Sequence, residues 1–344
     1  MGVATLDAAL LGAEPIVVAE LLRDVVDGPT LVEVRGAFPD PLPVPTARAL
    51  ATIAAVTVAL DAPPTATMEP FDLTVTAGAT DDVRAAFHRA PLAAVAAAVL
   101  LRAAPRPLFD GLVAESATYS GLQAGPEFRS WRALRPPVDS VPDADAPRVR
   151  VEEHAGHREI VLVRGPRHNA LDVRMRDALH AALVDAAATD APVLLRGEGP
   201  SFCSGGDLDE FGTFPDPALA HLVRLDRSLA LAVAAIADRL VVALHGSCLG
   251  AGIELPAFAR HVVAAEDTRL GLPEQAMGLV PGAGGTVSIA RRAGRRTVLA
   301  LLLRDGTVDA EHARAIGLVD EVVTPEALHD RAVAAVRSTA ARTR

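Results

Sequence analysis

The sequence predicts an α/β protein with a layered, mostly parallel sheet, because short apolar strands alternate with helical segments and glycine-rich loops after residue 148. Predicted strands cover Ile160–Val163, Val193–Leu195, Val241–Leu244, Val262–Ala264 and Leu318–Val323. Predicted helices cover Leu171–Ala187 and Pro217–Leu240, a third begins near Ala251, and the remainder to Arg344 is mainly helical. Helical spacing of apolar residues, such as Leu179 and Leu183, supports these assignments.

Composition limits the classes of protein that this chain can represent. At 344 residues it is long enough for two domains. Half of the residues are hydrophobic and only 3% are aromatic, so the core must consist mainly of Ala, Val and Leu. The richest apolar stretch, Pro91–Leu101, is too short to span a membrane, and we expect no signal peptide.

Charge and cysteine content point to a protein of the cytoplasm without nucleic-acid or membrane partners. The formal charge of −10 disfavours general binding to nucleic acid or anionic lipid. The two cysteines, Cys203 and Cys248, do not form a disulfide framework, which favours a reducing compartment. The histidines lack metal-ligand spacing, so we expect no metal.

All 33 basic residues are arginines, which excludes Schiff-base chemistry on lysine. The pairs Arg291–Arg292 and Arg295–Arg296 leave room for an anionic ligand.

A Pro- and Asp-rich segment at 136–147 predicts a linker between two parts of the chain. We therefore expect an N-terminal region at 1–137, a linker at 138–148 and a catalytic domain at 149–344.

The N-terminal region repeats the later pattern weakly. Leu31–Gly36 is similar to Pro192–Gly197, and the strand at Phe71–Val75 corresponds to His261–Ala265. The first copy has no glycine-rich loops between these points, so the hypothesis is a degenerate, inactive duplicate. Chance similarity between short apolar runs is an equally open alternative.

Two small-residue loops, Phe202–Asp207 and Gly250–Glu254, offer backbone N–H groups for a developing negative charge. We predict that the N–H groups of Gly206 and Ala251 stabilise an oxyanion, at roughly 3–4 kcal/mol each. The alternative is that both loops are ordinary tight turns that need glycine.

Two glutamates, Glu254 and Glu274, are the candidate acid–base pair. Either one alone is explained by dipole compensation or helix capping. Together they can hold one water and exchange protons with a substrate carbon, because close carboxylates often differ in pKa. Asp207 and Asp209–Glu210 are predicted to cap a following helix, and both cysteines are read as packing residues.

Four segments resemble the crotonase superfamily, which comprises enoyl-CoA hydratases and isomerases. They are Arg167–Leu171, Phe202–Leu208, His245–Leu255 and Leu272–Thr286, and their order and spacing also fit over roughly residues 150–325. The resemblance implies a crotonase-like ββα spiral catalytic domain, preceded here by an atypical N-terminal α/β region. It also implies assembly as a homotrimer or hexamer.

The same resemblance implies an acyl-CoA thioester substrate and no cofactor beyond the coenzyme A of that substrate. The thioester oxygen would bind the N–H groups of Gly206 and Ala251, while Glu254 and Glu274 would activate the water that adds across a 2,3-double bond. Residues assigned to the CoA channel by the resemblance are Arg167, His168, Ala170, Cys203, Ser204 and Gly205.

The chain departs from the family pattern in where its last helices lie. Only about one helix follows Val323, whereas Phe109–Ser116 and Gly125–Arg129 resemble the family's terminal helices. We therefore expect residues 90–135 to supply a lid or an oligomer surface. Enoyl-CoA hydration is the leading activity; isomerisation, a cofactor-free biosynthetic variant and a catalytically silent assembly subunit are the alternatives.

Overall fold

A computed structural model describes residues 2–13, 15–24, 26–63, 68–135 and 146–342. Its N-terminal sheet contains four parallel strands in the order β1-β2-β3-β4. These strands are β1 (Gly2–Asp7), β2 (Thr30–Arg35), β3 (Val56–Leu60) and β4 (Leu73–Val75). Every residue of β3 is buried, as expected for a parallel strand covered on both faces.

The C-terminal sheet has six strands in the order β13-β10-β8-β7-β6-β5. They are β5 (Val149–His154), β6 (His157–Leu162), β7 (Val193–Gly197), β8 (Leu240–Leu244), β10 (His261–Ala265) and β13 (Glu321–Val323). All neighbours are parallel except β5 and β6, which form a hairpin. The predicted α/β class with a mostly parallel sheet is confirmed, although β5 was not predicted.

A third, three-stranded sheet lies beside the glycine-rich loops. It consists of β9 (Ser247–Leu249), β11 (Arg269–Gly271) and β12 (Thr307–Asp309), with β11 in the middle. β9 and β11 run parallel and β12 runs antiparallel to β11. The sequence did not predict these short strands.

The helices of the N-terminal region are α1 (Pro15–Asp24), α2 (Val44–Thr52), α3 (Thr80–Arg89), α4 (Pro91–Arg102), α5 (Leu108–Gln123) and α6 (Pro126–Ala133). Those that follow are α7 (Val173–Ala187), α8 (Pro217–Asp226), α9 (Leu229–Ala234), α10 (Ala251–Glu254), α11 (Gly285–Ala293), α12 (Arg295–Ala300), α13 (Ala310–Ala315) and α14 (Leu328–Arg342). The predicted single helix over 217–240 is wrong: α8 ends at Asp226, and Ser228 caps α9 by accepting from the Leu231 N–H at 3.2 Å.

Helices cover both faces of the C-terminal sheet. Ala332, Ala335 and Val336 of α14 pack with strand residues such as Val241 and Val263. The other face joins a larger core that includes residues of α7 and α9. Asp172 fixes the start of α7 by accepting a hydrogen bond from the Met175 N–H at 2.7 Å.

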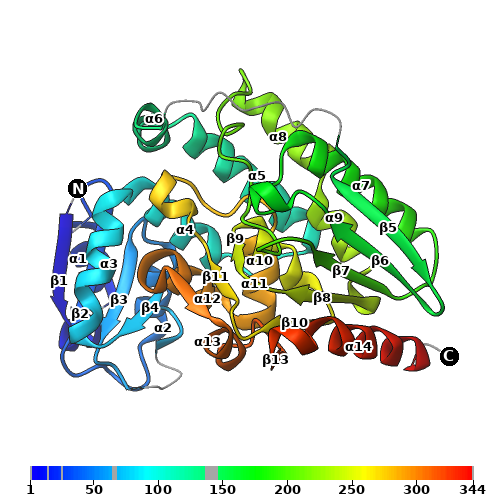
Figure 1. The fold of residues 1–344 in the computed structure, drawn as a ribbon. Coiled ribbons are helices and arrows are strands. Elements are labelled where there is room, and N and C mark those ends of the chain that lie inside the picture. The colour runs from blue at the N-terminus through cyan, green and yellow to red at the C-terminus, as the bar shows by residue number, and fades with distance from the viewer. Residues whose placement is uncertain (1, 14, 25, 64–67, 136–145, 343–344) are drawn as a thin grey trace.

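The N-terminal region and the C-terminal sheet share one hydrophobic core, although their sheets lie at opposite ends of the molecule (Figure 1). The pair Arg295–Arg296, considered above for an anionic ligand, donates instead to the backbone carbonyl oxygens of Met68 and Phe71. These arginines therefore hold α12 against the segment before β4.

The strand order bears on the predicted duplication. The parallel run β1-β2-β3-β4 follows the order of the chain, and so does the run β6-β7-β8-β10. The correspondence of β2 with β7 and of β4 with β10 is the one proposed from the sequence. The two topologies agree with a duplicated origin, which stays a prediction. Most of the predicted linker, at 138–145, lies outside the described residues.

Among the residues described, no single helix has both the length and the apolarity needed to cross a membrane. One bent pair, Ala77–Arg89 with Pro91–Arg102, passes by length and composition alone, with 107° between its halves.

Candidate active site

The two small-residue loops lie side by side. The Cys203 N–H donates to the Ser247 carbonyl oxygen at 3.3 Å, and the Leu249 N–H donates to the Cys203 carbonyl oxygen at 3.1 Å. A side chain at Gly252 would collide with that same carbonyl oxygen, so only glycine permits the close approach. Gly206 and Ala251, the predicted oxyanion donors, consequently line one cavity.

The amide groups of those two residues are available to a ligand. Within the described chain, neither the Gly206 N–H nor the Ala251 N–H donates to a protein acceptor. Ala251 is the first residue of α10, where N–H groups are left without intrahelical partners. This arrangement can stabilise negative charge on a carbonyl oxygen.

Glu254 ends the short helix α10 and is only 2% exposed. Its Oε2 accepts hydrogen bonds from the N–H groups of Ala283 and Gly285 at 2.7 and 2.8 Å. Its carbonyl oxygen also accepts a bond from the Ser288 hydroxyl at 2.6 Å. These contacts fix the carboxylate against the first turn of α11.

Glu274 begins the 3₁₀ turn Glu274–Met277 and faces the same cavity. A Cβ placed on Gly250 would collide with Glu274 Oε1 and lie 3.8 Å from Glu254 Oε1, so both carboxylates approach one point of the backbone. Gly250 also has a φ of 51°, which favours glycine. Glu274 Oε2 is buried without a hydrogen-bond partner among the described residues.

Burial changes the acidity of both groups. It raises the pKa of Glu274 to about 8, and it raises the pKa of Glu254 well above its ordinary value, with the charge of Glu274 as the next cause. Two backbone donors favour the carboxylate form of Glu254, whereas the unpartnered Oε2 of Glu274 favours its protonated form. Two close carboxyl groups in such different hydrogen-bonding environments can share one proton, so that one acts as a base and the other as an acid.

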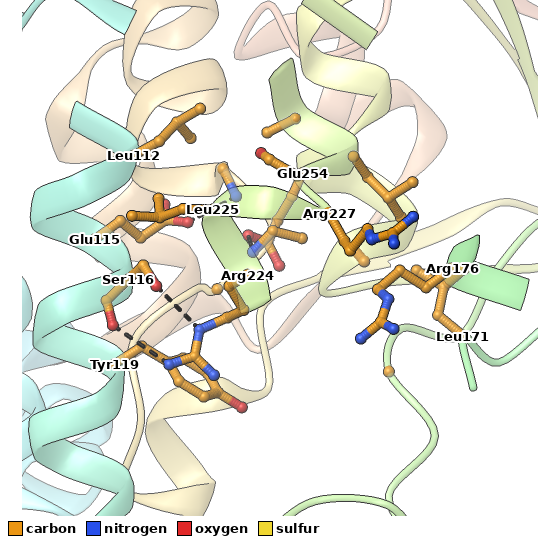
Figure 2. Close-up of a pocket in the computed structure, with 18 of the residues that line it drawn as sticks. Leu112, Glu115, Ser116, Tyr119, Leu171, Arg176, Arg224, Leu225, Arg227 and Glu254 are labelled. Atoms are coloured by element: carbon orange, nitrogen blue, oxygen red, sulfur yellow. Dashed lines mark hydrogen bonds between the residues drawn. The ribbon is translucent and has the colours of Figure 1, made fainter. Parts of the chain in front are cut away.

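The cavity has a volume of about 240 Å³, and Figure 2 shows side chains from distant segments around it. Helix α5 of the N-terminal region contributes Leu112, Glu115, Ser116 and Tyr119, and α8 contributes Arg224. Residues 90–135 thus form part of the cavity wall, where a lid from this region would lie. Their function as a lid remains a proposal.

Glu115 is a third buried carboxylate, held by the loop before α11 and its first turn. It accepts hydrogen bonds from the N–H groups of Gly284 and Thr286 at 2.7 and 2.9 Å and from the Thr286 hydroxyl at 2.6 Å. Burial raises the pKa of Glu115 to about 7. Glu115 and Glu254 together satisfy N–H groups that α11 leaves unpaired at its start.

The residues assigned to a CoA channel by resemblance gather next to the cavity but do not line it. Their loops meet where the Ser204 N–H donates to the His168 carbonyl oxygen at 3.0 Å. Arg167 pairs with Asp209 at 2.7 Å. None of Arg167, His168, Ala170, Cys203, Ser204 and Gly205 contacts the cavity formed by the described residues.

The predicted capping role of Asp207 and Asp209–Glu210 is wrong, because residues 208–212 form turns and the next helix begins at Pro217. Asp207 instead pairs with Arg164 at 2.8 Å. Glu210 accepts a hydrogen bond from the Val173 N–H at 2.8 Å, which places it at the start of α7.

Sequence reasoning missed Glu115, Tyr119 and Arg224 as cavity residues. The resemblance of Phe109–Ser116 to a terminal helix was the available signal for Glu115. Nothing in the sequence indicated that Arg224 would lie in the cavity, because its contacts with α5 join residues more than 100 positions apart.

One cluster outside the cavity has potential metal ligands that the sequence spacing did not indicate. Ligand atoms of His154, His157 and Glu159 lie within 4.8 Å of one another. Glu159, however, already pairs with Arg196 at 2.7 Å and with His157 at 3.2 Å. A buried ion-pair network accounts for these contacts.

Known proteins are similar to a large part of this chain. The profile of the enoyl-CoA hydratase/isomerase family matches residues 152–344. A probable enoyl-CoA hydratase from Bacillus subtilis is 34% identical over 46% of this chain and 63% of its own length. The probable enoyl-CoA hydratase echA17 from Mycobacterium avium is 33% identical over 52% of this chain and 70% of its own length.

Solved structures show the same similarity. The enoyl-CoA hydratase from Thermoplasma volcanium has 30% identity and a TM-score of 0.52 over 56% of this chain and 78% of its own. A putative enoyl-CoA hydratase/isomerase from Mycobacterium abscessus has 32% identity and a TM-score of 0.51 over 56% and 76% of the two chains. Because the family profile covers residues 152–344, more than half of the chain, the chain belongs to the enoyl-CoA hydratase/isomerase family, within the crotonase superfamily.

Proposed function

We propose that this protein adds water across the 2,3-double bond of an enoyl-CoA thioester. The observation that carries the proposal is the convergence of Gly206, Ala251, Glu254 and Glu274 on one cavity. Family membership supplies the substrate class, and the two carboxylates favour hydration over reactions that need only one of them. No further cofactor enters the proposed reaction.

In the proposed reaction, Glu254 accepts a proton from water as the water oxygen forms a bond to C3. The π electrons move toward the thioester oxygen, and the N–H groups of Gly206 and Ala251 stabilise the charge that forms there. Glu274 then gives its proton to C2, which completes the hydration. A proton must return from Glu254 to Glu274 before the next turnover.

The hydrogen bonds around the two acids support this division of roles. A pKa of about 8 leaves Glu274 mostly protonated at neutral pH, as a proton donor to carbon requires. The two N–H bonds to Glu254 hold one carboxylate oxygen in place and so orient the group as the base.

Incubation with crotonyl-CoA followed by mass spectrometry tests the proposal. Gain of one water by the thioester is the expected result, whereas a shifted double bond at unchanged mass would indicate isomerisation. Glu254→Gln and Glu274→Gln should each lower kcat by ~10²–10⁴-fold, the usual contribution of a positioned acid or base. Glu311→Gln, an exposed residue of α13, is the matched control. Undiminished turnover in both active-site variants would reject the mechanism.

We also propose a cytoplasmic homotrimer or hexamer, as the family resemblance implies. Light scattering on the purified full chain measures the subunit number directly, and a monomer at all concentrations would contradict the proposal.

A further inference from the structure

Arg224 places a positive charge in the wall of the cavity. Its Nε donates to the Ser116 Oγ at 3.1 Å, and its Nη2 reaches the Ser116 carbonyl oxygen at 3.4 Å and also contacts the Ser120 hydroxyl. The guanidinium carbon lies 4.6 Å from the centre of the Tyr119 ring. Figure 2 shows this side chain between α5 and the cavity. All of these partners are neutral, so they position the charge without neutralising it.

No carboxylate in the described part of the chain lies within ion-pair distance of Arg224. The other two arginines of the cavity have acidic partners: Arg176 lies 2.8 Å from Asp177, and Arg227 lies 3.2 Å from Asp226. Burial lowers the pKa of Arg224, and the acidic groups Tyr119 and Glu115 oppose this effect, but the Glu115 oxygens bond to the start of α11. A half-buried cation without a counter-ion is costly unless a ligand supplies one.

The remaining guanidinium nitrogen is available for that ligand. Nε and Nη2 are directed to α5, whereas Nη1 of Arg224 makes no hydrogen bond to the described protein atoms and is not enclosed by them. Arginine binds carboxylates in preference to neutral groups because its planar N–H donors match the carboxylate oxygens.

We propose that Arg224 binds a carboxylate at the far end of the acyl chain, so that the substrate is the CoA thioester of an unsaturated dicarboxylic acid. This inference rests on the proposed enoyl-CoA function. The cavity that contains Arg224 also contains Glu254 and Glu274, so a thioester placed against the two loops directs its acyl chain into the space that Arg224 borders. The phosphates of CoA are separated from the thioester by the whole pantetheine arm.

The acidic groups of the cavity do not prevent binding of an acidic chain. Glu274 is mostly neutral at pH 7, and Glu254 and Glu115 accept hydrogen bonds from backbone N–H groups at the start of α11. Tyr119 lies between Arg224 and the loop at Gly282, and burial keeps its hydroxyl neutral by raising its pKa, although the charge of Arg224 acts in the other direction. The cation is therefore the group that selects the charge of the acyl chain.

Turnover of a matched pair of substrates, hex-2-enedioyl-CoA and hex-2-enoyl-CoA, tests the inference. We expect the native protein to prefer the diacid thioester in kcat/KM by about 10–100-fold, the ratio that corresponds to one charged hydrogen bond. Arg224→Met, which keeps length but removes charge, should abolish this preference and retain or raise turnover of hex-2-enoyl-CoA. Arg224→Lys should recover part of the preference, and the exposed Arg314→Gln should leave it unchanged. Retained turnover of the neutral substrate also shows that the variant folds.

Calorimetric binding of adipoyl-CoA and hexanoyl-CoA, which lack the double bond, measures the same preference without turnover. Tighter binding of adipoyl-CoA than of hexanoyl-CoA, without any hydration of the enoyl thioesters, would refute the proposed function and support this inference. Equal affinity of the native protein for both thioesters would overturn the inference. Equal loss of affinity for both thioesters in Arg224→Met would also overturn the inference. That result would mean that Arg224 binds the CoA phosphates or only packs against its neighbours.

Discussion

Replacement of Glu274 by Gln should stabilise the fold at alkaline pH while it removes the proposed proton donor. Burial raises the pKa of Glu274 from 4.5 to about 8, so the folded protein resists ionisation of this group. Because the folded-state pKa is the higher one, its contribution to stability is complete below about pH 4.5 and is lost as pH rises toward 8. Each pKa unit corresponds to about 1.36 kcal/mol, which gives a loss of roughly 5 kcal/mol above pH 8.

The Gln variant has no titrating group at this position, so its free energy of unfolding does not fall for this reason. The difference in free energy of unfolding between Glu274→Gln and the native chain should therefore grow by about 4 kcal/mol between pH 5 and pH 9. Urea denaturation followed by circular dichroism at several pH values measures it, with Glu311→Gln as the control. A difference that stays constant across this range would refute the assignment of Glu274 as a buried, neutral acid.

Three further predictions concern the same site. The kcat/KM for hydration should fall about tenfold per pH unit above pH 8, because the proposed proton donor Glu274 ionises there. The decay of the enoyl-thioester absorbance measures the rate. A profile that is flat up to pH 10 would contradict this role of Glu274. Gly252→Ala should reduce kcat/KM and lower Tm, because the added methyl group collides with the Cys203 carbonyl oxygen and separates the two loops. A variant with the kcat/KM of the native protein would disprove this close contact. Glu115→Ala should lower the free energy of unfolding by about 2–4 kcal/mol in urea denaturation, because buried N–H groups at the start of α11 lose their acceptor. A change below about 0.5 kcal/mol would show that water takes the place of the Glu115 carboxylate.

The parts of the site that the sequence predicts are those encoded locally. The loops at Phe202–Asp207 and Gly250–Glu254 combine glycines with a preceding strand, and the structure brings both to one cavity. Glu254 ends the second loop and Glu274 follows the segment Gly271–Pro273, and the structure places both acids at this cavity. Their chemical roles remain proposals.

The sequence did not predict other features, because they depend on contacts between distant residues or are too short to form a pattern. Strands β9, β11 and β12 have three residues each, too few to show a period of two. The break between α8 and α9 contains neither Gly nor Pro, and its signal is the single capping hydroxyl of Ser228. Arg224 becomes interpretable only when α5 is placed beside α8, an outcome of tertiary packing.

The division of the cavity between α5 and the two small-residue loops would separate two kinds of change during evolution. The proposed acids and oxyanion donors come from 206–274, while another part of the wall comes from 112–119. Under the proposed function, mutation at 112–119 would change which acyl groups are accepted and leave the proposed acid–base groups in place. Such a division would let one reaction be applied to several substrates.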